Sequence, residues 1–248
     1  MVVRPLRRSR VLRTLCCLGF CGGGTGPYRE WARVLDDNTD LALVCYPGRE
    51  GRYAEPPPRT WAELVEDATE AIRTVVTGPY VLFGHSMGGW VAFDVVQRLY
   101  EREENLPTSL VVSACNAPQR GLTERDRFPR AEDTDEELIA WMKTGGLLPE
   151  YVYTDSDLLA MAVELMRSDV SVRDTYHFTG GSAPVPVEML YGADDAVIDP
   201  AAGEQWRAVC PSGLTVTTLP GGHFYTPDVW RRLPTRIAAL TCALSTSD

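Results

Sequence analysis

The most informative stretch of this chain runs from Tyr80 to Trp90 and reads Tyr-Val-Leu-Phe-Gly-His-Ser-Met-Gly-Gly-Trp. Its first four residues are an apolar run typical of a short buried strand, and the apolar positions over Met87–Leu99 predict a helix. Between them, Gly84-His85-Ser86-Met87-Gly88 matches the pattern G-x-S-x-G. Between a strand and a helix, this pattern is typical of a sharp turn that lifts a serine hydroxyl clear of the sheet. The motif therefore predicts that Ser86 is a nucleophile.

Short apolar runs and helical patterns alternate on both sides of this turn. Strands are expected over Leu12–Leu18, Leu41–Cys45, Tyr80–Phe83, Leu110–Ala114, Val187–Tyr191 and Thr215–Leu219. An amphipathic helix is expected over Thr60–Val76, where Thr60 and Glu63 have the spacing of a capping box. This alternation predicts an α/β fold in which helices cover both faces of a mostly parallel sheet.

The alternation is interrupted between residues 117 and 183. Helices are expected there over Thr134–Lys143, with a capping pair at Thr134 and Glu137, and over Ser156–Met166. Helices inserted between successive strands of one sheet favour a lid over an independent domain. A length of 248 residues also fits one large α/β domain. We therefore expect a single domain over residues 1–248, with a helical lid inserted at about 117–183.

Composition excludes several classes of protein. The chain is 44% hydrophobic, which excludes disorder and fibrous structure, and its net charge of −10 argues against nucleic-acid binding. The arginine-rich start followed by Val11–Phe20 is similar to a secretory signal peptide. We favour a first strand instead, because the run is short, is broken by Cys16, Cys17 and Gly19, and leads into a glycine loop. No stretch approaches the ~18 apolar residues of a membrane span. We expect a monomeric cytoplasmic protein with no membrane partner.

Seven cysteines occur at irregular spacing, and the chain has only three histidines. Cys16, Cys17 and Cys21 do not have the spacing of a zinc site. We therefore expect reduced cysteines packed as small apolar side chains, with no metal site.

A serine nucleophile needs a base and a group that orients the base. His223 follows the last predicted strand in a glycine-rich loop, whereas His85 lies inside the Ser86 turn and His177 ends the predicted lid. We therefore assign His223 as the base. Asp194 and Asp195 both follow the strand that ends at Tyr191, and we prefer Asp195 as the third member. The order serine, aspartate, histidine is that of an α/β-hydrolase.

Two backbone N–H groups are candidates for stabilising an oxyanion. Met87 begins the helix after the nucleophile, where N–H groups face developing negative charge. The second candidate is Cys21, because Cys21-Gly22-Gly23-Gly24-Thr25-Gly26 follows the first predicted strand and allows close backbone approach. No G-K-[ST] follows this loop, so it is not a phosphate-binding loop.

Five separated segments carry a further likeness. They are Cys21–Gly23 with Tyr28, Arg29 and Trp31; Tyr46–Glu50; Gly84–Gly89 with Ala92–Asp94; Arg167–Asp169 with Tyr176; and Pro220–Phe224. Together they resemble the motifs of the type II (editing) thioesterases of polyketide and nonribosomal peptide synthases, in the α/β-hydrolase superfamily. Tyr46-Pro47-Gly48-Arg49-Glu50 is the most specific of them, because ordinary esterases lack it. The chain departs from the family at Leu18-Gly19-Phe20, where phenylalanine-proline-histidine is usual.

This resemblance implies hydrolysis of acyl groups from the phosphopantetheine arm of acyl or peptidyl carrier proteins. Stalled or aberrant chains would be removed in this way during polyketide, nonribosomal peptide and antibiotic biosynthesis. The partners would be carrier proteins and their acyl thioesters, and the enzyme would need no cofactor of its own, since the substrate carries the phosphopantetheine.

Three other functions stay open at this point. A carboxylesterase or perhydrolase of the same fold would prefer oxyesters to thioesters. A chain-releasing or cyclising thioesterase would yield a cyclic product, although the initial methionine and the lack of a linker favour a free-standing protein. A non-catalytic binding protein would not react covalently at Ser86.

Overall fold

The computed structural model describes residues 1–127, 129–146 and 148–241. Within these ranges, seven strands form one sheet in the order β1-β3-β2-β4-β5-β6-β7. The strands are β1 Val2–Val3, β2 Arg13–Leu18, β3 Thr39–Val44, β4 Tyr80–His85, β5 Ser109–Ser113, β6 Val187–Gly192 and β7 Leu214–Leu219. The pairs from β3 to β7 are parallel, and β1 is antiparallel to β3. The predicted α/β class and all six predicted strands are confirmed.

The short strand β1 was not predicted. Val2 and Val3 pair with Val44 and Leu43 at the edge of the sheet. Two residues are too few to show the alternation that identifies a strand, so only the neighbouring strand reveals their conformation.

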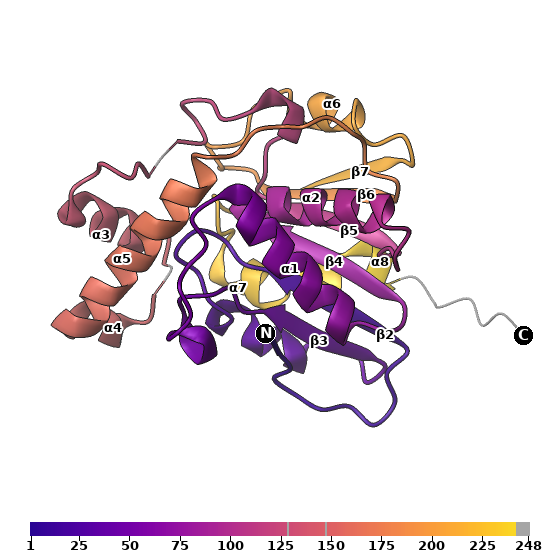
Figure 1. The fold of residues 1–248 in the computed structure, drawn as a ribbon, viewed down its shortest axis with the longest axis horizontal. Coiled ribbons are helices and arrows are strands. Elements are labelled where there is room, and N and C mark those ends of the chain that lie inside the picture. Colours follow the sequence, from indigo (N-terminus) through magenta and orange to yellow (C-terminus); the bar gives the residue numbers. More distant parts are fainter. Residues whose placement is uncertain (128, 147, 242–248) are drawn as a thin grey trace, which may run out of the picture.

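Helices flank this sheet and extend beyond it. The α-helices are α1 Trp61–Val75, α2 Met87–Glu101, α3 Asp135–Thr144, α4 Glu150–Thr154, α5 Ser156–Arg173, α6 Ala202–Arg207, α7 Pro227–Arg231 and α8 Ala238–Thr241. Short 3₁₀ helices are η1 Gly26–Arg33, η2 Glu50–Arg52, η3 Pro118–Arg120 and η4 Leu233–Arg236. In Figure 1, α1 and α2 lie in front of the sheet, and the yellow helices α7 and α8 lie behind it. No helix in the described ranges is long and apolar enough to cross a membrane.

The two predicted capping boxes have different outcomes. Thr134 and Glu137 form the full reciprocal box at the start of α3. At the start of α1, the Thr60 hydroxyl accepts the N–H of Glu63, but the Glu63 carboxylate accepts the N–H of Arg59. The reciprocal bond thus goes to the residue before the cap, and the box predicted at Thr60 is only half formed.

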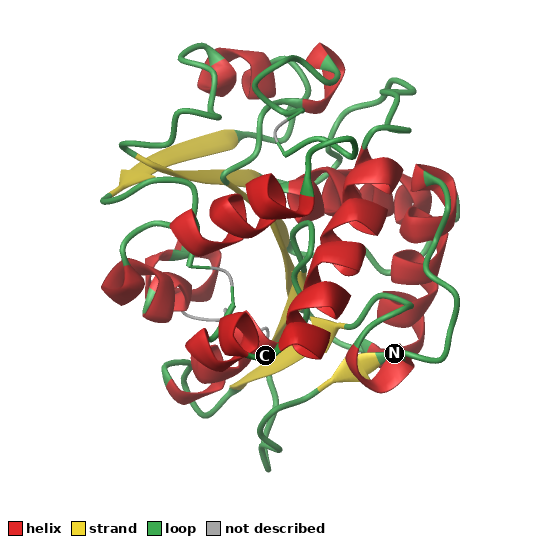
Figure 2. Ribbon diagram, turned by 90° about the vertical axis from the view of Figure 1, so that its left-hand side faces the viewer, coloured by secondary structure: helices red, strands yellow, loops and turns green. Residues whose placement is uncertain are grey.

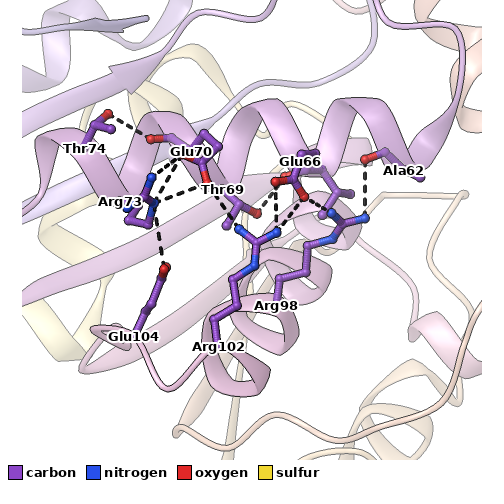
Figure 3. Close-up of polar contacts among 10 residues, drawn as sticks. Ala62, Glu66, Thr69, Glu70, Arg73, Thr74, Arg98, Arg102 and Glu104 are labelled. Atoms are coloured by element: carbon purple, nitrogen blue, oxygen red, sulfur yellow. Dashed lines mark hydrogen bonds and ion pairs between the residues drawn. The ribbon is translucent and has the colours of Figure 1, made fainter.

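Ion pairs join α1 to α2 on their solvent side, as Figure 3 shows. Arg102, the residue after α2, contacts Glu66 at 2.9 Å and Glu70 at 3.2 Å, and Arg98 of α2 also pairs with Glu66. Exposed pairs of this kind contribute little each, at most about 1 kcal/mol. Most of the stability of α1 and α2 therefore comes from their buried faces, which include Leu64 and Phe93.

The basic N-terminal residues pair with acids that follow η1. Arg4 pairs with Asp40, and Arg8 and Arg13 lie 3.0 Å from Asp37 and Asp36. Residues 13–18, part of the run Val11–Phe20 that is similar to a signal peptide, form β2 in the interior of the sheet between β3 and β4. The arginines thus tie the N-terminal segment and β2 to the residues around the start of β3.

Helices α3, α4 and α5, which follow β5 and precede β6 in the sequence, form a separate group. They lie at the left of Figure 1, and Figure 2 views the molecule from that side. Helix α4 was not predicted, and α5 continues to Arg173 rather than ending near Met166. The polar sequence Arg167-Ser168-Asp169 ends the apolar pattern, yet Asp169 and Arg173 are buried in the fold. Tertiary partners for these charges thus extend the helix.

Candidate active site

Ser86 lies in the turn between β4 and α2 with an unusual backbone conformation. Its φ is 55° and its ψ is −124°, a region that costs a non-glycine residue on the order of 1–3 kcal/mol. A Cβ at Gly84 would overlap the Gly88 backbone, and one at Gly88 would lie 2.6 Å from the carbonyl oxygen of Gly19. The two glycines therefore permit the sharp turn, which holds Ser86 above the sheet.

Three residues from separate loops meet at this turn. The Ser86 Oγ lies 2.9 Å from His223 Nε2, and His223 Nδ1 lies 2.9 Å from Asp195 Oδ2. The other carboxylate oxygen of Asp195 accepts the N–H of Val197 at 3.0 Å, and its side chain is only 1% exposed. Asp194 is exposed. The fold thus brings Ser86, His223 and Asp195 into one hydrogen-bonded row and leaves Asp194 outside it.

The other two histidines are placed differently. His177 is exposed, and His85 is fully buried beside the His223 ring. Burial lowers the pKa of His85 well below its usual value, so the ring stays neutral. His85 Nδ1 lies 2.9 Å from the Ser113 hydroxyl, which is 2.7 Å from the Tyr225 hydroxyl. This chain of hydrogen bonds anchors the His223 loop to β4 and β5.

Cys21, the second candidate oxyanion donor, lies in the glycine loop after β2. Cys21 and Met87 line the same cavity as Ser86 and His223. The N–H of Gly22 donates to Asp169 at 2.8 Å and that of Gly23 to the Phe20 carbonyl at 2.9 Å. Among the described residues, none accepts the N–H of Cys21, so this group is available to a ligand.

The loop is held from outside by two residues that the sequence did not identify as site residues. Arg49, after β3, forms a bidentate ion pair with Asp169 of α5 at 2.8 and 2.6 Å, and its Nη1 also donates to the Gly23 carbonyl at 2.7 Å. Their motifs carried the family resemblance, but nothing in the sequence indicated that they meet. The ion pair thus holds the glycine loop at two points, the N–H of Gly22 and the carbonyl of Gly23.

Glu50 forms a second brace, one residue further along the chain. Its carboxylate accepts the Thr25 N–H at 2.8 Å and the Thr25 hydroxyl at 2.6 Å. Together with Arg49, it fixes the end of the glycine loop opposite Cys21. The motif Tyr46–Glu50 therefore acts on the conformation of this loop.

A cavity of about 90 Å³ opens beside Ser86. Its walls include the apolar side chains Phe20, Trp90, Trp141 and Phe224, and the polar side chains Asn116, Asp126 and Arg173. Asn116 accepts the N–H of Asp199 at 2.8 Å and donates to Asp126 at 2.7 Å, which ties the loop after β5 to the loop after β6. Neither Asn116 nor Trp141 has a local motif that would have identified it in the sequence.

The cysteines of the described residues are buried and unpaired: Cys16, Cys17, Cys21, Cys45, Cys115 and Cys210. Cys242 lies outside the described residues. Burial raises the pKa of the Cys21 thiol to about 12, so its side chain is an uncharged wall of the cavity. No group of three or more His, Cys, Asp or Glu side chains in the described ranges is arranged to hold a metal ion.

Known proteins resemble this chain over most of its length. A family model described as "Thioesterase domain" matches residues 13–237. Gramicidin S biosynthesis protein GrsT of Aneurinibacillus migulanus is 27% identical over 85% of this chain and 82% of its own length. The type II thioesterase BorB from the borrelidin biosynthetic cluster is 32% identical, with a TM-score of 0.79 over 96% of this chain and 94% of its own.

A further solved structure supports the fold alone. ClbQ from the colibactin NRPS/PKS pathway has a TM-score of 0.82 at 23% identity, over 92% of this chain and 96% of its own. These similarities confirm the predicted α/β-hydrolase-like fold and the resemblance to type II thioesterases. The chain belongs to the thioesterase family and is a hydrolase of thioesters.

Proposed function

We propose that this thioesterase removes acyl groups from the phosphopantetheine arm of acyl or peptidyl carrier proteins, with Ser86, His223 and Asp195 as its catalytic residues. The observation that carries the proposal is the row of two 2.9 Å contacts that links the three side chains at the cavity. The relatives GrsT and BorB, named for gramicidin S and borrelidin biosynthesis, support a role in assembling such a product. The enzyme needs no cofactor of its own, because the substrate supplies the phosphopantetheine.

Acyl transfer to the enzyme begins at Ser86. With Nδ1 protonated and directed at Asp195, His223 Nε2 takes the hydroxyl proton as Oγ forms a bond to the thioester carbon. The carbonyl oxygen becomes an oxyanion, which the N–H groups of Met87 and Cys21 stabilise. The C–S bond then breaks, and His223 gives its proton to the departing sulfur, which leaves as the thiol.

Hydrolysis of the resulting ester regenerates the enzyme. His223 takes a proton from water while the water oxygen bonds to the acyl carbon, again with the oxyanion held by Met87 and Cys21. The bond to Ser86 Oγ breaks, Oγ recovers the proton from His223, and the free acid leaves. Asp195 keeps the imidazole oriented and stabilises its cation in both halves of the reaction.

The test compares carrier-bound acyl thioesters with oxyesters of the same acyl group. We expect a higher kcat/KM for the thioesters and no turnover of either by Ser86→Ala. A fluorophosphonate should label the wild-type protein at Ser86 and leave Ser86→Ala unlabelled. Preference for oxyesters would favour a carboxylesterase or perhydrolase, a cyclic product would favour a releasing enzyme, and an unlabelled wild type would favour a binding protein.

A further inference from the structure

A second cavity lies directly beside the catalytic one. It has a volume of about 300 Å³, and it is bounded by η1, the loop after α3 and the segment around α7. Its lining includes the aromatic residues Trp31, Tyr225 and Trp230, together with Glu30, Gly145 and Arg231. Phe20 and Phe224 line the catalytic cavity as well, so the two spaces share one aromatic wall.

This wall consists of two rings in edge-to-face contact. The centroids of Phe20 and Phe224 are 4.9 Å apart with an interplanar angle of 71°. Phe20 is buried, and a Cβ at Gly23 would lie 2.7 Å from its ring, so the glycine loop holds it in place. Phe224 is only partly buried. Of the two rings, Phe224 is therefore the one with room to turn aside.

The size of the catalytic cavity limits what it can hold alone. At about 90 Å³, the catalytic cavity is less than a third the size of the second cavity, at about 300 Å³. A short acyl group bound to Ser86 fits within this space. A longer chain must leave it, and the second cavity begins at the shared wall.

The walls of the second cavity favour an apolar chain. The indole N–H of Trp31 already donates to the Trp230 carbonyl at 2.8 Å, and that of Trp230 donates to the Pro27 carbonyl at 3.1 Å. These residues therefore offer ring faces rather than free donors to a ligand. The charged side chains of Glu30 and Arg231 are 60% and 58% exposed, which places them at the solvent edge. The amide-bearing pantetheine arm would find few partners among these ring faces, so the lining favours the acyl chain.

We infer that the second cavity is the subsite for the distal part of an apolar acyl chain bound to Ser86, and that Phe224 is the gate that a long chain must displace. The inference rests on the proposed thioester hydrolysis at Ser86. On this basis, Phe20 and Phe224 determine which length of acyl chain the enzyme prefers. Each methylene buried beyond the gate contributes about fourfold in binding, so selectivity depends strongly on whether the gate opens.

The test measures kcat/KM for acetyl and octanoyl thioesters of N-acetylcysteamine and uses the octanoyl-to-acetyl ratio of each variant. This ratio cancels a general loss of activity or of folded protein. Phe224→Ala removes the gate, and we expect the ratio to rise about tenfold or more. Gly145 lines the second cavity, so Gly145→Trp adds bulk to its wall, and we expect the ratio to fall by about tenfold. Gly145 has a φ of −76°, so a side chain there needs no unusual backbone. Gly145→Ala is the control at the same position with a small side chain, and its ratio should stay close to that of the wild type.

Two outcomes would overturn the inference. In the first, the ratio stays unchanged in both Phe224→Ala and Gly145→Trp. In the second, Gly145→Trp raises KM equally for the two thioesters, which would assign the cavity to the thiol arm that they share. Failure of the proposed function gives a different result, because it would be visible in the wild type itself, as a preference for oxyesters over thioesters or as absence of labelling at Ser86.

Discussion

The guanidinium of Arg49 and the carboxylate of Asp169 form a buried bidentate ion pair, although 120 positions separate them in the sequence. Their side chains are only 3% and 4% exposed. Asp169 also accepts the N–H of Gly22, and Arg49 also donates to the carbonyl of Gly23. One ion pair thus joins the loop after β3, helix α5 and the glycine loop beside Ser86. It makes the shape of the candidate oxyanion loop depend on the position of α5.

Removing one partner of this pair should damage both stability and catalysis. Arg49→Met or Asp169→Leu leaves the opposite charge buried without a partner, and we expect the free energy of unfolding to fall by about 3–5 kcal/mol. We also expect kcat to fall, because the glycine loop loses the hydrogen bond to its Gly22 N–H or to its Gly23 carbonyl. Urea denaturation and hydrolysis of an acetyl thioester measure the two effects.

The double variant Arg49→Met/Asp169→Leu separates the two effects. Two apolar side chains leave no buried charge, so most of the lost stability should return. The kcat should stay low, because neither side chain can bond to the glycine loop. Recovery of kcat together with stability would mean that the pair acts through stability alone.

A methyl group at Gly22 should displace the same loop. Gly22 has a φ of 70°, and a Cβ there would lie 2.5 Å from the side chain of Met166 on α5. We expect Gly22→Ala to lower kcat by about 10²-fold, the usual cost of losing one oxyanion donor. Gly26→Ala is the matched control, because a Cβ at Gly26 meets nothing within 4 Å. Equal activity of the two variants would contradict the prediction that the conformation at Gly22 governs the reaction.

The neighbouring aspartates after β6 should differ sharply in their effect on the reaction. Asp195→Asn removes the carboxylate that orients His223, and we expect kcat to fall by about 10⁴-fold with the fold intact. Asp194→Asn changes an exposed side chain, and we expect little effect on kcat. Steady-state hydrolysis of one thioester by both variants distinguishes them, and a larger loss in Asp194→Asn would reverse the assignment.

Asp94 on α2 should make stability depend on pH. Burial raises the pKa of Asp94 from 3.8 to about 6, although Trp61 donates a hydrogen bond to its carboxylate at 2.6 Å. The folded protein therefore holds this proton more tightly than the unfolded chain, and the contribution of Asp94 to stability falls as pH rises from about 4 through about 6. Above pH ~7 the buried charge costs about 2–3 kcal/mol.

Asp94→Asn removes this charge and keeps an oxygen that can accept from Trp61. We expect the variant to be more stable than the wild type at pH ~7.5 and the difference to shrink at pH ~4.5, as measured by urea denaturation. Buried His85 also titrates below its usual pKa, but it is present in both proteins, so the difference between them isolates Asp94. A difference that does not change with pH would contradict the prediction.

Local patterns were sufficient for the strands and for the nucleophile turn. Each of the six predicted strands lies within two residues of its observed bounds, because apolar runs bounded by Gly and Pro are read from the sequence alone. Ser86 was identifiable because its turn needs glycine on both sides, and His223 because it follows a strand in a glycine-rich loop. In such cases the physical requirement and its sequence signal lie within a few residues of each other.

Such local patterns could not predict the contacts between segments that are distant in the sequence. The end of α5 at Arg173, the pairing of β1 with β3, and the ion pair of Arg49 with Asp169 all depend on partners remote in sequence. A charged side chain is expected at the surface unless a partner compensates for its burial, and local sequence does not reveal that partner.

The sequence alone was enough for the class of fold and for Ser86, His223 and Asp195 as candidates, since strand ends and turns carry local signals. Only the tertiary structure decided that Asp195 rather than Asp194 faces His223, that α5 braces the glycine loop, and that Phe20 and Phe224 divide two cavities. The physical reason is that side-chain direction, burial and cavity shape arise from packing between segments that are far apart in the chain.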